Sequence, residues 1–288
     1  MSGSAKVEVL SVSKAFGEGQ GAVPALEGVS FQVPAGGFTS LLGPSGCGKS
    51  TLFNIIAGLL QPDAGDVLLD GRSVLGQPGQ VGYMLQKDLL LPWRSIQDNI
   101  ILGATLRHIP ARQARKQAAP LLERYDLSEF ARSRPHELSG GMRQRAALLR
   151  TLLTEKETLL LDEPFGALDA LTRLQLQMDL TDMWQEFHKT ILLVTHDVEE
   201  ALLLSDEILV LSHRPGRLKK RVAVPLPRPR EPDMLALPEA MEIKRELLHL
   251  LLREKEGLSQ NKGWFALPGK ETPASPITEI CENGVYYK

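Results

Sequence analysis

The stretch Gly43-Pro44-Ser45-Gly46-Cys47-Gly48-Lys49-Ser50 decides the fold of this chain. It matches the pattern of a glycine, four residues and Gly-Lys-Ser, in which the glycines let backbone N–H groups turn toward phosphate oxygens. Residues 38–42 before it form a short apolar run typical of a buried strand, and residues 51–58 after it read as a helix that ends at a glycine. Because a strand, a loop and a helix in this order place the positive end of the helix on the ligand, the sequence predicts a phosphate-binding loop, here called the P-loop.

In such a loop the lysine, Lys49, reaches the β- and γ-phosphates of a nucleotide, and the hydroxyl of Ser50 binds Mg²⁺. A second motif supplies acids. The apolar run 158–161 predicts a strand buried on both faces, and Asp162 and Glu163 follow at its carboxyl end, where open α/β sheets bind ligands. Alone, this pair could be a solvated strand end; after a P-loop we expect Asp162 to hold Mg²⁺ through water and Glu163 to polarise an attacking water.

A third motif is the segment 138–144, Leu-Ser-Gly-Gly-Met-Arg-Gln. Ser139 is a good helix N-cap, and Ala146, Leu149, Leu152 and Leu153 recur at helical spacing, so a helix is predicted to start here. One interpretation is a capped amphipathic helix without a ligand. However, two glycines at a helix start leave backbone N–H groups bare, which suits a phosphate.

These three motifs, in this order, resemble the nucleotide-binding subunit of an ATP-binding cassette (ABC) transporter over about residues 6–225. The resemblance implies an α/β P-loop NTPase cassette with an N-terminal antiparallel β subdomain, a RecA-like core and an inserted helical subdomain. It also implies that ATP and Mg²⁺ are the cofactors and that ATP is hydrolysed. In this family the segment at Ser139 completes the site of the partner subunit, so the chain is expected to form a head-to-tail homodimer.

Four further segments agree with the family in order and approximate spacing. Gln86 matches the Q-loop glutamine after a strand, Asp169 matches the D-loop, His196 matches the switch histidine, and Phe16 matches the aromatic ring that packs on adenine. Alone, His196 could be an ordinary strand-end histidine and Phe16 a core residue. The resemblance assigns catalytic roles to Lys49, Gln86, Glu163 and His196, magnesium binding to Ser50, Gln86 and Asp162, and nucleotide binding to Phe16, Gly43, Pro44, Ser45, Gly46, Cys47, Gly48, Lys49, Ser50, Thr51, Ser139, Gly140, Gly141 and Asp169.

Composition restricts the partners and the location. A formal net charge of -2 without a basic stripe gives no support for a nucleic-acid partner. The chain has no apolar run of about 18 residues and no secretory N-terminus, so we expect a soluble subunit that binds peripherally at the cytoplasmic face of the cell membrane. Cys47 and Cys281 do not suggest a disulfide framework or a metal site, and Cys47 inside the P-loop fits a reduced compartment.

Periodicity divides the chain into segments. Residues 6–33 read as strands around a glycine-rich turn, the helical subdomain is expected at about 88–157 with a helix over 112–125, and core strands return at Thr158, Thr190 and Glu207. Asp197 and Glu200 form a plausible capping box for the next helix. The absence of an internal repeat predicts one cassette. We expect an ATP-binding domain at 1–228 and an extension at 229–288, with a helix over 241–254 whose Leu247, Leu248, Leu251 and Leu252 share a face, and a loosely held tail from Gly257.

Three stretches, 88–94, 163–173 and 211–216, resemble importers of nitrate, sulfonates and taurine, whose relatives also carry thiamine precursors. That resemblance implies membrane permease subunits and, indirectly, a periplasmic or surface solute-binding protein as partners. The alternatives are an exporter ATPase or a soluble non-transport ABC ATPase; a chromosome- or repair-type ATPase would need a long coiled-coil insertion. The apolar run 89–93 after Gln86 predicts a docking surface for the permease, unless its leucines pack inside the helical subdomain.

Overall fold

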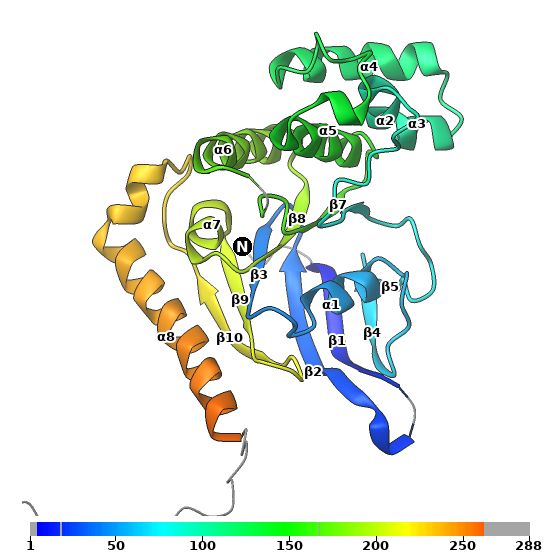
Figure 1. The fold of residues 1–288 in the computed structure, drawn as a ribbon. Helices are drawn as coiled ribbons and strands as arrows, with labels where there is room; N and C mark the ends of the chain where they lie inside the picture. Colours follow the sequence, from blue (N-terminus) through cyan, green and yellow to red (C-terminus); the bar gives the residue numbers. More distant parts are fainter. Residues whose placement is uncertain (1–4, 18, 167, 262–288) are drawn as a thin grey trace, which may run out of the picture.

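The computed structural model describes residues 5–17, 19–166 and 168–261, which form two β-sheets and helices around them (Figure 1). The smaller sheet is antiparallel and has the strand order β2-β1-β4-β5. Its strands are β1 (Ala5–Phe16), β2 (Val23–Pro34), β4 (Ala64–Leu69) and β5 (Arg72–Ser73). In β2, Val29, Phe31 and Val33 alternate with exposed positions, because only one face of this sheet packs on the core. The sequence predicted strands at residues 7–10 and 29–33, which are shorter than β1 and β2, and it did not predict β4 and β5.

The larger sheet has the order β10-β9-β3-β8-β7-β6, and all its neighbours are parallel except β10, which pairs antiparallel at the edge. Its strands are β3 (Phe38–Leu42), β6 (Gly82–Met84), β7 (Thr158–Asp162), β8 (Thr190–Thr195), β9 (Glu207–Leu211) and β10 (Leu218–Ala223). Every residue of β3, β7 and β8 is buried, as parallel strands covered on both faces require. Because these strands are parallel, their carboxyl ends lie at one edge of the sheet. The strand starts predicted at Thr158, Thr190 and Glu207 are confirmed by the bounds of β7, β8 and β9.

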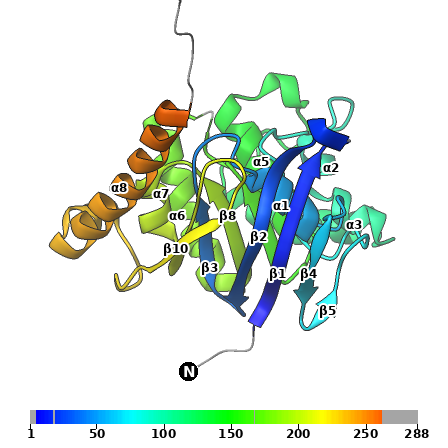
Figure 2. The ribbon, with the colours of Figure 1, turned by 90° about the horizontal axis from the view of Figure 1, so that it is seen from below.

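In Figure 1, α5 and α6 lie above the larger sheet, α2 and α3 lie beside α5, and α4 lies at the top of the molecule. Figure 2 shows β1, β2 and β4 side by side, away from α6, α7 and α8. The helices are α1 (Lys49–Ile56), α2 (Ile96–Ile100), α3 (Leu102–Leu106), α4 (Ala111–Arg124), α5 (Gly140–Leu152), α6 (Ala170–Phe187), α7 (Val198–Leu204) and α8 (Pro238–Asn261), with short 3-10 turns η1 (Gly19–Gly21), η2 (Pro135–Glu137) and η3 (Pro232–Ala236). The helix predicted over 112–125 is confirmed to within one residue as α4. One cluster of buried apolar side chains contains residues of helices α2, α3, α4, α5 and α6 and of strands β7 and β8.

The cap of α7 differs from the prediction. Asp197 caps the helix by accepting hydrogen bonds from the backbone N–H groups of Glu199 and Glu200, as expected. The reciprocal half of the capping box is wrong, because the hydroxyl of Thr195 takes its place. That hydroxyl accepts from the N–H of Asp197 at 3.0 Å and donates to the buried carboxylate of Glu200 at 2.6 Å. Burial raises the pKa of Glu200, and this hydrogen bond from Thr195 opposes the rise.

Helix α8 is longer than the predicted helix 241–254 at both ends. Leu247 is buried in a cluster with α7 and β10, but Leu248 and Leu252 are 40% and 54% exposed, so only part of the predicted four-leucine face packs on the core. The reason is that α8 packs on the core through a narrow stripe that contains Ala240, Ile243 and Leu247. The loose tail was predicted from Gly257, yet residues 257–261 continue α8; the rest of that prediction, 262–288, lies outside the described residues.

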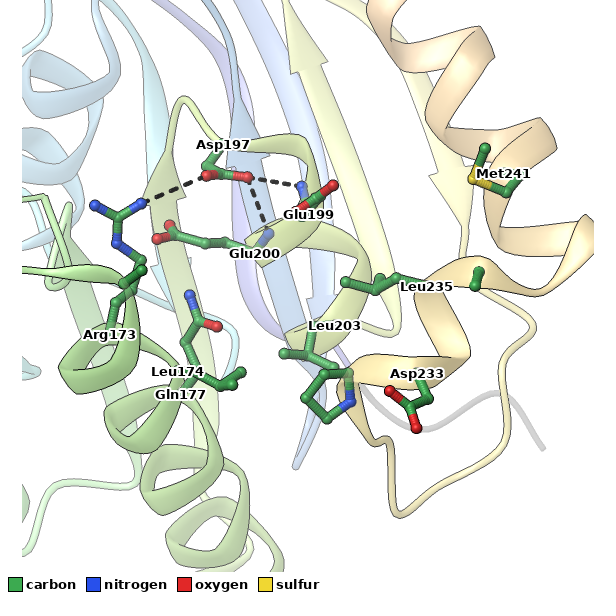
Figure 3. A pocket seen from close by; sticks show the side chains of 13 residues that line it. Arg173, Leu174, Gln177, Asp197, Glu199, Glu200, Leu203, Asp233, Leu235 and Met241 are labelled. Carbon is green, nitrogen blue, oxygen red and sulfur yellow. Dashed lines mark hydrogen bonds and ion pairs between the residues drawn. The ribbon is translucent and has the colours of Figure 1, made fainter.

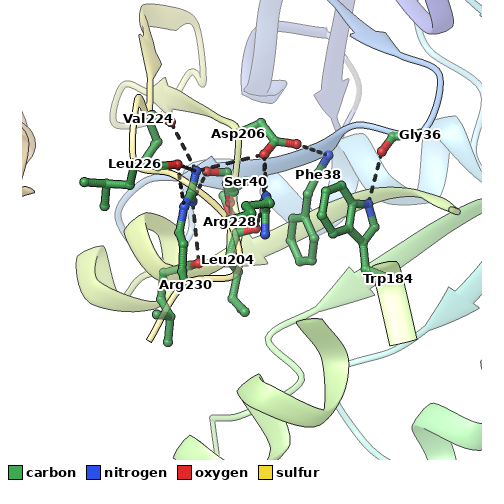
Figure 4. A network of polar contacts seen from close by, with 12 residues as sticks. Gly36, Phe38, Ser40, Trp184, Leu204, Asp206, Val224, Leu226, Arg228 and Arg230 are labelled. Atoms are coloured by element: carbon green, nitrogen blue, oxygen red, sulfur yellow. Dashed lines mark hydrogen bonds and ion pairs between the residues drawn. The ribbon is translucent and has the colours of Figure 1, made fainter. Parts of the chain in front are cut away.

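Two arginines hold the segment before α8 on the core (Figure 4). The guanidinium of Arg228 contacts Asp206 at 2.8 Å and lies 4.0 Å from the ring centroid of Trp184 on α6. Arg230 is 2% exposed, and burial lowers its pKa to about 10. Its guanidinium donates to backbone carbonyl oxygens of Leu202, Leu203, Ser205, Val224 and Leu226. Since Leu202 and Leu203 lie in the last turn of α7, Arg230 satisfies carbonyl groups that the helix end leaves open.

Candidate functional site

The P-loop connects β3 to α1 and holds the lysine at its end. Gly46 and Gly48 have φ angles of 78° and 104°, a left-handed conformation that favours glycine. A Cβ atom at Gly48 would also lie 2.7 Å from Cδ2 of Leu26, so this position has no room for a side chain. Lys49 is buried, and its ammonium donates to the carbonyl oxygens of Gly43 at 2.7 Å and Pro44 at 2.9 Å. The first N–H groups of α1 begin directly after this turn and are available to an anion.

Two acids end strand β7 beside the P-loop. Asp162 is 4% exposed, and its carboxylate lies near the hydroxyl of Ser50. Burial raises the pKa of Asp162; the Ser50 hydroxyl and the charge of Lys49 oppose the rise, and the charge of Glu163 adds to it. Glu163 has a φ angle of 46°, which is uncommon for a residue with a side chain and is the kind of strain found at functional sites. Its N–H donates to the carbonyl of Val194 at 2.9 Å, which fixes this conformation.

The carboxylate of Glu163 has a contact on each oxygen. The side-chain amide of Gln86 donates from Nε2 to Oε2 at 3.0 Å, and Nδ1 of His196 lies 3.3 Å from Oε1. Gln86, Glu163 and His196 follow strands β6, β7 and β8, which are neighbours in the larger sheet. Three residues that are far apart in the sequence therefore meet because their strands are parallel and end at the same edge.

A cavity of about 320 Å³ lies in front of the P-loop. Eight of its nine lining residues belong to the predicted site, and the ninth, Arg214, was not predicted. The only sequence signal for Arg214 is its place in the stretch 211–216, which resembles importer subunits but contains no phosphate-binding motif. The lining residues are Ser45, Gly46, Gly48, Lys49, Ser50, Thr51, Gln86, Glu163 and Arg214.

Other predicted nucleotide-binding residues lie outside this cavity. Cys47 is buried behind the P-loop, where burial raises the pKa of its thiol, and a Cβ atom at Gly43 would lie 3.0 Å from its sulfur. Pro44 does not line the cavity either, and its carbonyl oxygen accepts from Lys49. Phe16 ends β1 and is 41% exposed, with the ammonium of Lys14 5.9 Å from its ring centroid.

The segment at Ser139 lies beside the start of α6. Ser139 caps α5 and accepts a hydrogen bond from the N–H of Met142 at 3.3 Å, which confirms the predicted N-cap. Asp169 caps α6 in the same way, and hydrogen bonds from Thr172 lower its pKa. A Cβ atom at Gly141 would lie 2.6 Å from Cγ2 of Thr172, whereas Gly140 has open space apart from one flexible side chain. None of these predicted residues lines the P-loop cavity of its own chain.

A larger cavity, of about 570 Å³, lies between α6, α7 and η3 (Figure 3). An ion pair of 3.9 Å between Arg173 on α6 and Asp197 crosses one side of it. Asp197 directly follows His196, so this contact joins the loop of the switch histidine to α6. The P-loop residues Gly46 and Gly48 and the acid Glu163 line the smaller cavity and not this one.

Sequence comparisons agree with this geometry. The family model described as "ABC transporter" matches residues 26–166. An uncharacterised ABC transporter ATP-binding protein of Methanocaldococcus jannaschii is 41% identical over 86% of this chain and 92% of its own length. A taurine import ATP-binding protein of Rhizobium johnstonii is 50% identical over 69% of this chain and 76% of its own, and an aliphatic sulfonates import ATP-binding protein of Bacillus licheniformis is 46% identical over 75% and 84%.

Solved structures of similar fold are cassettes as well. A dimeric post-hydrolysis state of an ATP-binding cassette bound to ADP and Pi aligns with a TM-score of 0.69 and 29% identity, covering 76% of this chain and 98% of that chain. A cassette of an ABC transporter complex from Clostridium perfringens shares the fold, with a TM-score of 0.68 over 88% of this chain and 99% of that one. These relatives confirm the predicted fold class. The chain belongs to the ABC transporter family, as a cassette that binds and hydrolyses ATP.

Proposed function

We propose that this chain is the ATPase subunit of an importer, which drives uptake of a small solute through separate membrane subunits. The observation that carries the chemistry is the contact of Gln86 and His196 with the two oxygens of Glu163, beside the P-loop cavity. The direction of transport is supported by relatives named as import ATP-binding proteins. Their names point to a sulfonate or taurine as solute; nitrate and thiamine precursors are the other members of the class that the resemblance implies.

Nucleotide binding starts with the P-loop. The ammonium of Lys49 now contacts the carbonyl oxygens of Gly43 and Pro44, inside a loop whose N–H groups suit phosphate oxygens. We assign the β- and γ-phosphates to Lys49 and to the N-terminal N–H groups of α1, including those of Ser50 and Thr51. The exposed ring of Phe16 would pack on the adenine.

The residues around Ser50 fit a magnesium ion. The Ser50 hydroxyl lies near the Asp162 carboxylate, and Ser50 and the side-chain amide of Gln86 line the same cavity. Oxygen ligands of this kind, one carboxylate together with substrate phosphates, are what Mg²⁺ prefers. When bound, the ion would neutralise charge that develops on the phosphates. Ser50 would hold it directly, Asp162 through water, and a nearby cation would favour the ionised carboxylate that burial disfavours.

Hydrolysis requires a group that accepts a proton from water. Glu163 is the proposed general base: a water between its carboxylate and the γ-phosphate attacks phosphorus, the bond to the β-phosphate oxygen breaks, and the water proton passes to Glu163. The amide of Gln86 donates to Oε2 of this carboxylate and so restrains its orientation beside the cavity. His196, 58% exposed, is proposed to hold the second oxygen and to reach the γ-phosphate.

A dimer would use the residues that lie outside the cavity. We propose that Ser139, Gly140, Gly141 and Asp169 act at the nucleotide of a second copy in a head-to-tail homodimer. The helix start at Ser139 offers backbone N–H groups that its own P-loop does not use, and a cassette relative is dimeric with ADP and Pi.

The membrane subunits are proposed to dock on the loop after Gln86. Trp93 is 68% exposed and Leu89 51%, next to charged neighbours, whereas Leu90 is buried in the helical cluster. An exposed apolar patch of this kind marks an interaction site. Among the described residues, no helix is long and apolar enough to cross a bilayer. We propose a peripheral location at the cytoplasmic membrane face, with residues 1–228 as the ATP-binding domain, 229–288 as an extension, and a solute-binding protein as an indirect partner.

Uptake measurements in cells test this function. Deleting the gene should abolish uptake of radiolabelled taurine or of a short alkanesulfonate, and the wild-type gene should restore it. The Lys49→Ala variant should not restore uptake, because it lacks the ammonium that binds the phosphates. Uptake of every solute in this class at wild-type rates in the deletion strain would contradict the importer assignment.

A further inference from the structure

Arg214 brings a second cation to the P-loop cavity. It belongs to the loop that joins β9 to β10, and its exposed side chain lines the cavity together with Lys49, Gln86 and Glu163. Across residues 5–17, 19–166 and 168–261, its guanidinium has no hydrogen bond or ion pair. The other arginine of the same loop, Arg217, is paired with Glu27 at 2.6 Å. A guanidinium that lines this cavity and has no partner within the described protein can pair with an anionic ligand there.

Contacts at both ends hold this loop against the P-loop. Before Arg214, Leu211 packs so closely on Gly43 that a Cβ atom there would lie 3.2 Å from it. After it, a Cβ atom at Gly216 would lie 2.2 Å from the carbonyl oxygen of Cys47, so the two backbones are in direct contact. Backbone hydrogen bonds join Gly216 to Ala25 at 2.8 Å and to Glu27 at 3.0 Å.

A hydroxyl closes the loop from inside. Ser212 accepts from the N–H of Arg217 at 2.9 Å, and its hydroxyl lies within hydrogen-bond distance of the carbonyl oxygens of His213 and Pro215. The backbone around Arg214 is therefore fixed on both sides. An arginine on a fixed backbone loses less conformational entropy when it binds a ligand than one on a mobile loop.

The charges at the cavity favour a phosphate contact. Of the residues that line it, Lys49 and Arg214 are cationic, and only Glu163 is acidic. The ammonium of Lys49 already donates hydrogen bonds to two P-loop carbonyl oxygens, whereas the guanidinium of Arg214 has no such bond within the described residues. Guanidinium groups form paired, charge-assisted hydrogen bonds with phosphate oxygens, which are stronger than neutral ones.

We propose that Arg214 is a further nucleotide-binding residue, whose guanidinium contacts the phosphate chain of ATP from the β9–β10 loop. The inference rests on the proposed assignment of the P-loop cavity as the nucleotide site. It adds to that site a contact from a fourth segment, beyond the P-loop and the ends of β6 and β7. The contact holds the phosphates and takes no part in proton transfer.

Nucleotide affinity of the full chain tests the proposal. In titrations with MgATP, Arg214→Ala should raise Kd on the order of tenfold, since a charge-assisted contact at a solvent-accessible site is lost. Arg214→Lys should recover part of the affinity. Arg217→Ala is the matched control, because it removes an arginine of the same loop that does not line the cavity, and it should leave Kd unchanged. Inorganic triphosphate should displace MgATP less effectively from Arg214→Ala than from wild type.

The outcomes separate the two assignments. An unchanged Kd in Arg214→Ala, or a loss equal to that in Arg217→Ala, would overturn the role of Arg214. A weaker MgATP affinity with undiminished displacement by triphosphate would also overturn it, since the contact would then be to the base or ribose. The MgATP affinity of Lys49→Ala is measured in the same experiment. Normal MgATP binding by Lys49→Ala would refute the nucleotide site itself. Weakened binding by Lys49→Ala would support that site, and the role of Arg214 would then be decided by Arg214→Ala alone. Equal thermal unfolding midpoints without nucleotide would confirm that all variants are folded.

Discussion

The side-chain amide of Gln86 donates a hydrogen bond to the carboxylate of Glu163, with 3.0 Å between Nε2 and Oε2. The two residues are 77 positions apart in the chain and follow adjacent parallel strands. This hydrogen bond connects the proposed general base, Glu163, to the start of the loop that runs from Gln86 to Trp93. A movement of either residue when nucleotide binds would reach the other directly.

The amide variant Glu163→Gln tests the general base. It keeps the shape and the acceptor oxygen, so MgATP binding should be retained, but hydrolysis should fall about 100-fold or more because the amide accepts no proton. Phosphate release by the assembled transporter measures the effect. Glu157→Gln, which alters an exposed partner of Lys189 far from the cavity, should keep the wild-type rate. A rate in Glu163→Gln within about twofold of wild type would show that another group takes the proton.

Dimerisation tests the role of Ser139. In the Glu163→Gln background, ATP should promote dimers, and adding Ser139→Arg should abolish them by placing a bulky cation at the interface. Light scattering with and without MgATP measures this. Because Ser139 is also a helix cap, its loss costs about 1 kcal/mol of stability. Ser95→Arg removes the similar cap of α2 and should still dimerise. Dimers that form regardless of ATP and of Ser139→Arg are incompatible with the head-to-tail arrangement.

The buried carboxyl group of Glu200 should make stability depend on pH. Burial raises its pKa in the folded state above the ordinary value of 4.5, so the folded chain holds this proton more tightly than the unfolded chain. Its contribution therefore destabilises the fold as pH rises from about 4.5 through the folded-state pKa. Glu200→Gln should lack this loss, because its amide oxygen still accepts from Thr195 without a charge.

Urea unfolding at several pH values gives the comparison. The difference in unfolding free energy between Glu200→Gln and wild type should shift in favour of the variant as pH rises through that window. Glu199→Gln changes the exposed neighbour that pairs with Lys244 and should not show this trend. Parallel pH curves for wild type and Glu200→Gln would rule out the raised pKa.

Trp93→Ala tests the docking surface. The side chain is 68% exposed, so its removal should spare folding and MgATP binding while it reduces copurification with the permease or solute uptake per ATP. Leu106→Ala is a suitable control, because Leu106 is 73% exposed in the same helical region but away from the Gln86 loop. Normal permease binding and normal uptake in Trp93→Ala would move the coupling surface elsewhere.

Arg230→Ala tests how the extension is held. The change leaves buried carbonyl groups of α7 and of the segment before η3 without a donor, and should lower the free energy of unfolding by about 2–4 kcal/mol. Thermal or urea unfolding measures the loss. Arg245→Ala, at an exposed position of α8, should change stability by less than about 0.5 kcal/mol. A similarly small change in Arg230→Ala would mean that water replaces the guanidinium without cost.

Local patterns made much of the fold predictable. The apolar runs at β3, β7 and β8 are buried on both faces and could be read as parallel strands from composition alone, and Ser139 and Asp197 cap helices through contacts within four residues. Errors arose where nearby groups compete for one donor and where a helix packs on distant segments. Thr195 replaces the expected capping-box contact of Glu200, and α8 buries Leu247 but leaves Leu248 exposed, because the surface it packs on comes from α7 and β10.

The sequence by itself determined the candidate residues of the site: the P-loop glycines, Lys49 and the acids after β7 follow from short-range rules about backbone freedom and charge. Only the tertiary structure decided which of them meet. Gln86, Glu163 and His196 come together because parallel strands end at one edge of the sheet, and Arg214 joins the cavity because its loop packs on Gly43 and Cys47. Such contacts depend on the order of strands in a sheet and on close packing between loops, neither of which leaves a periodic signal in the chain.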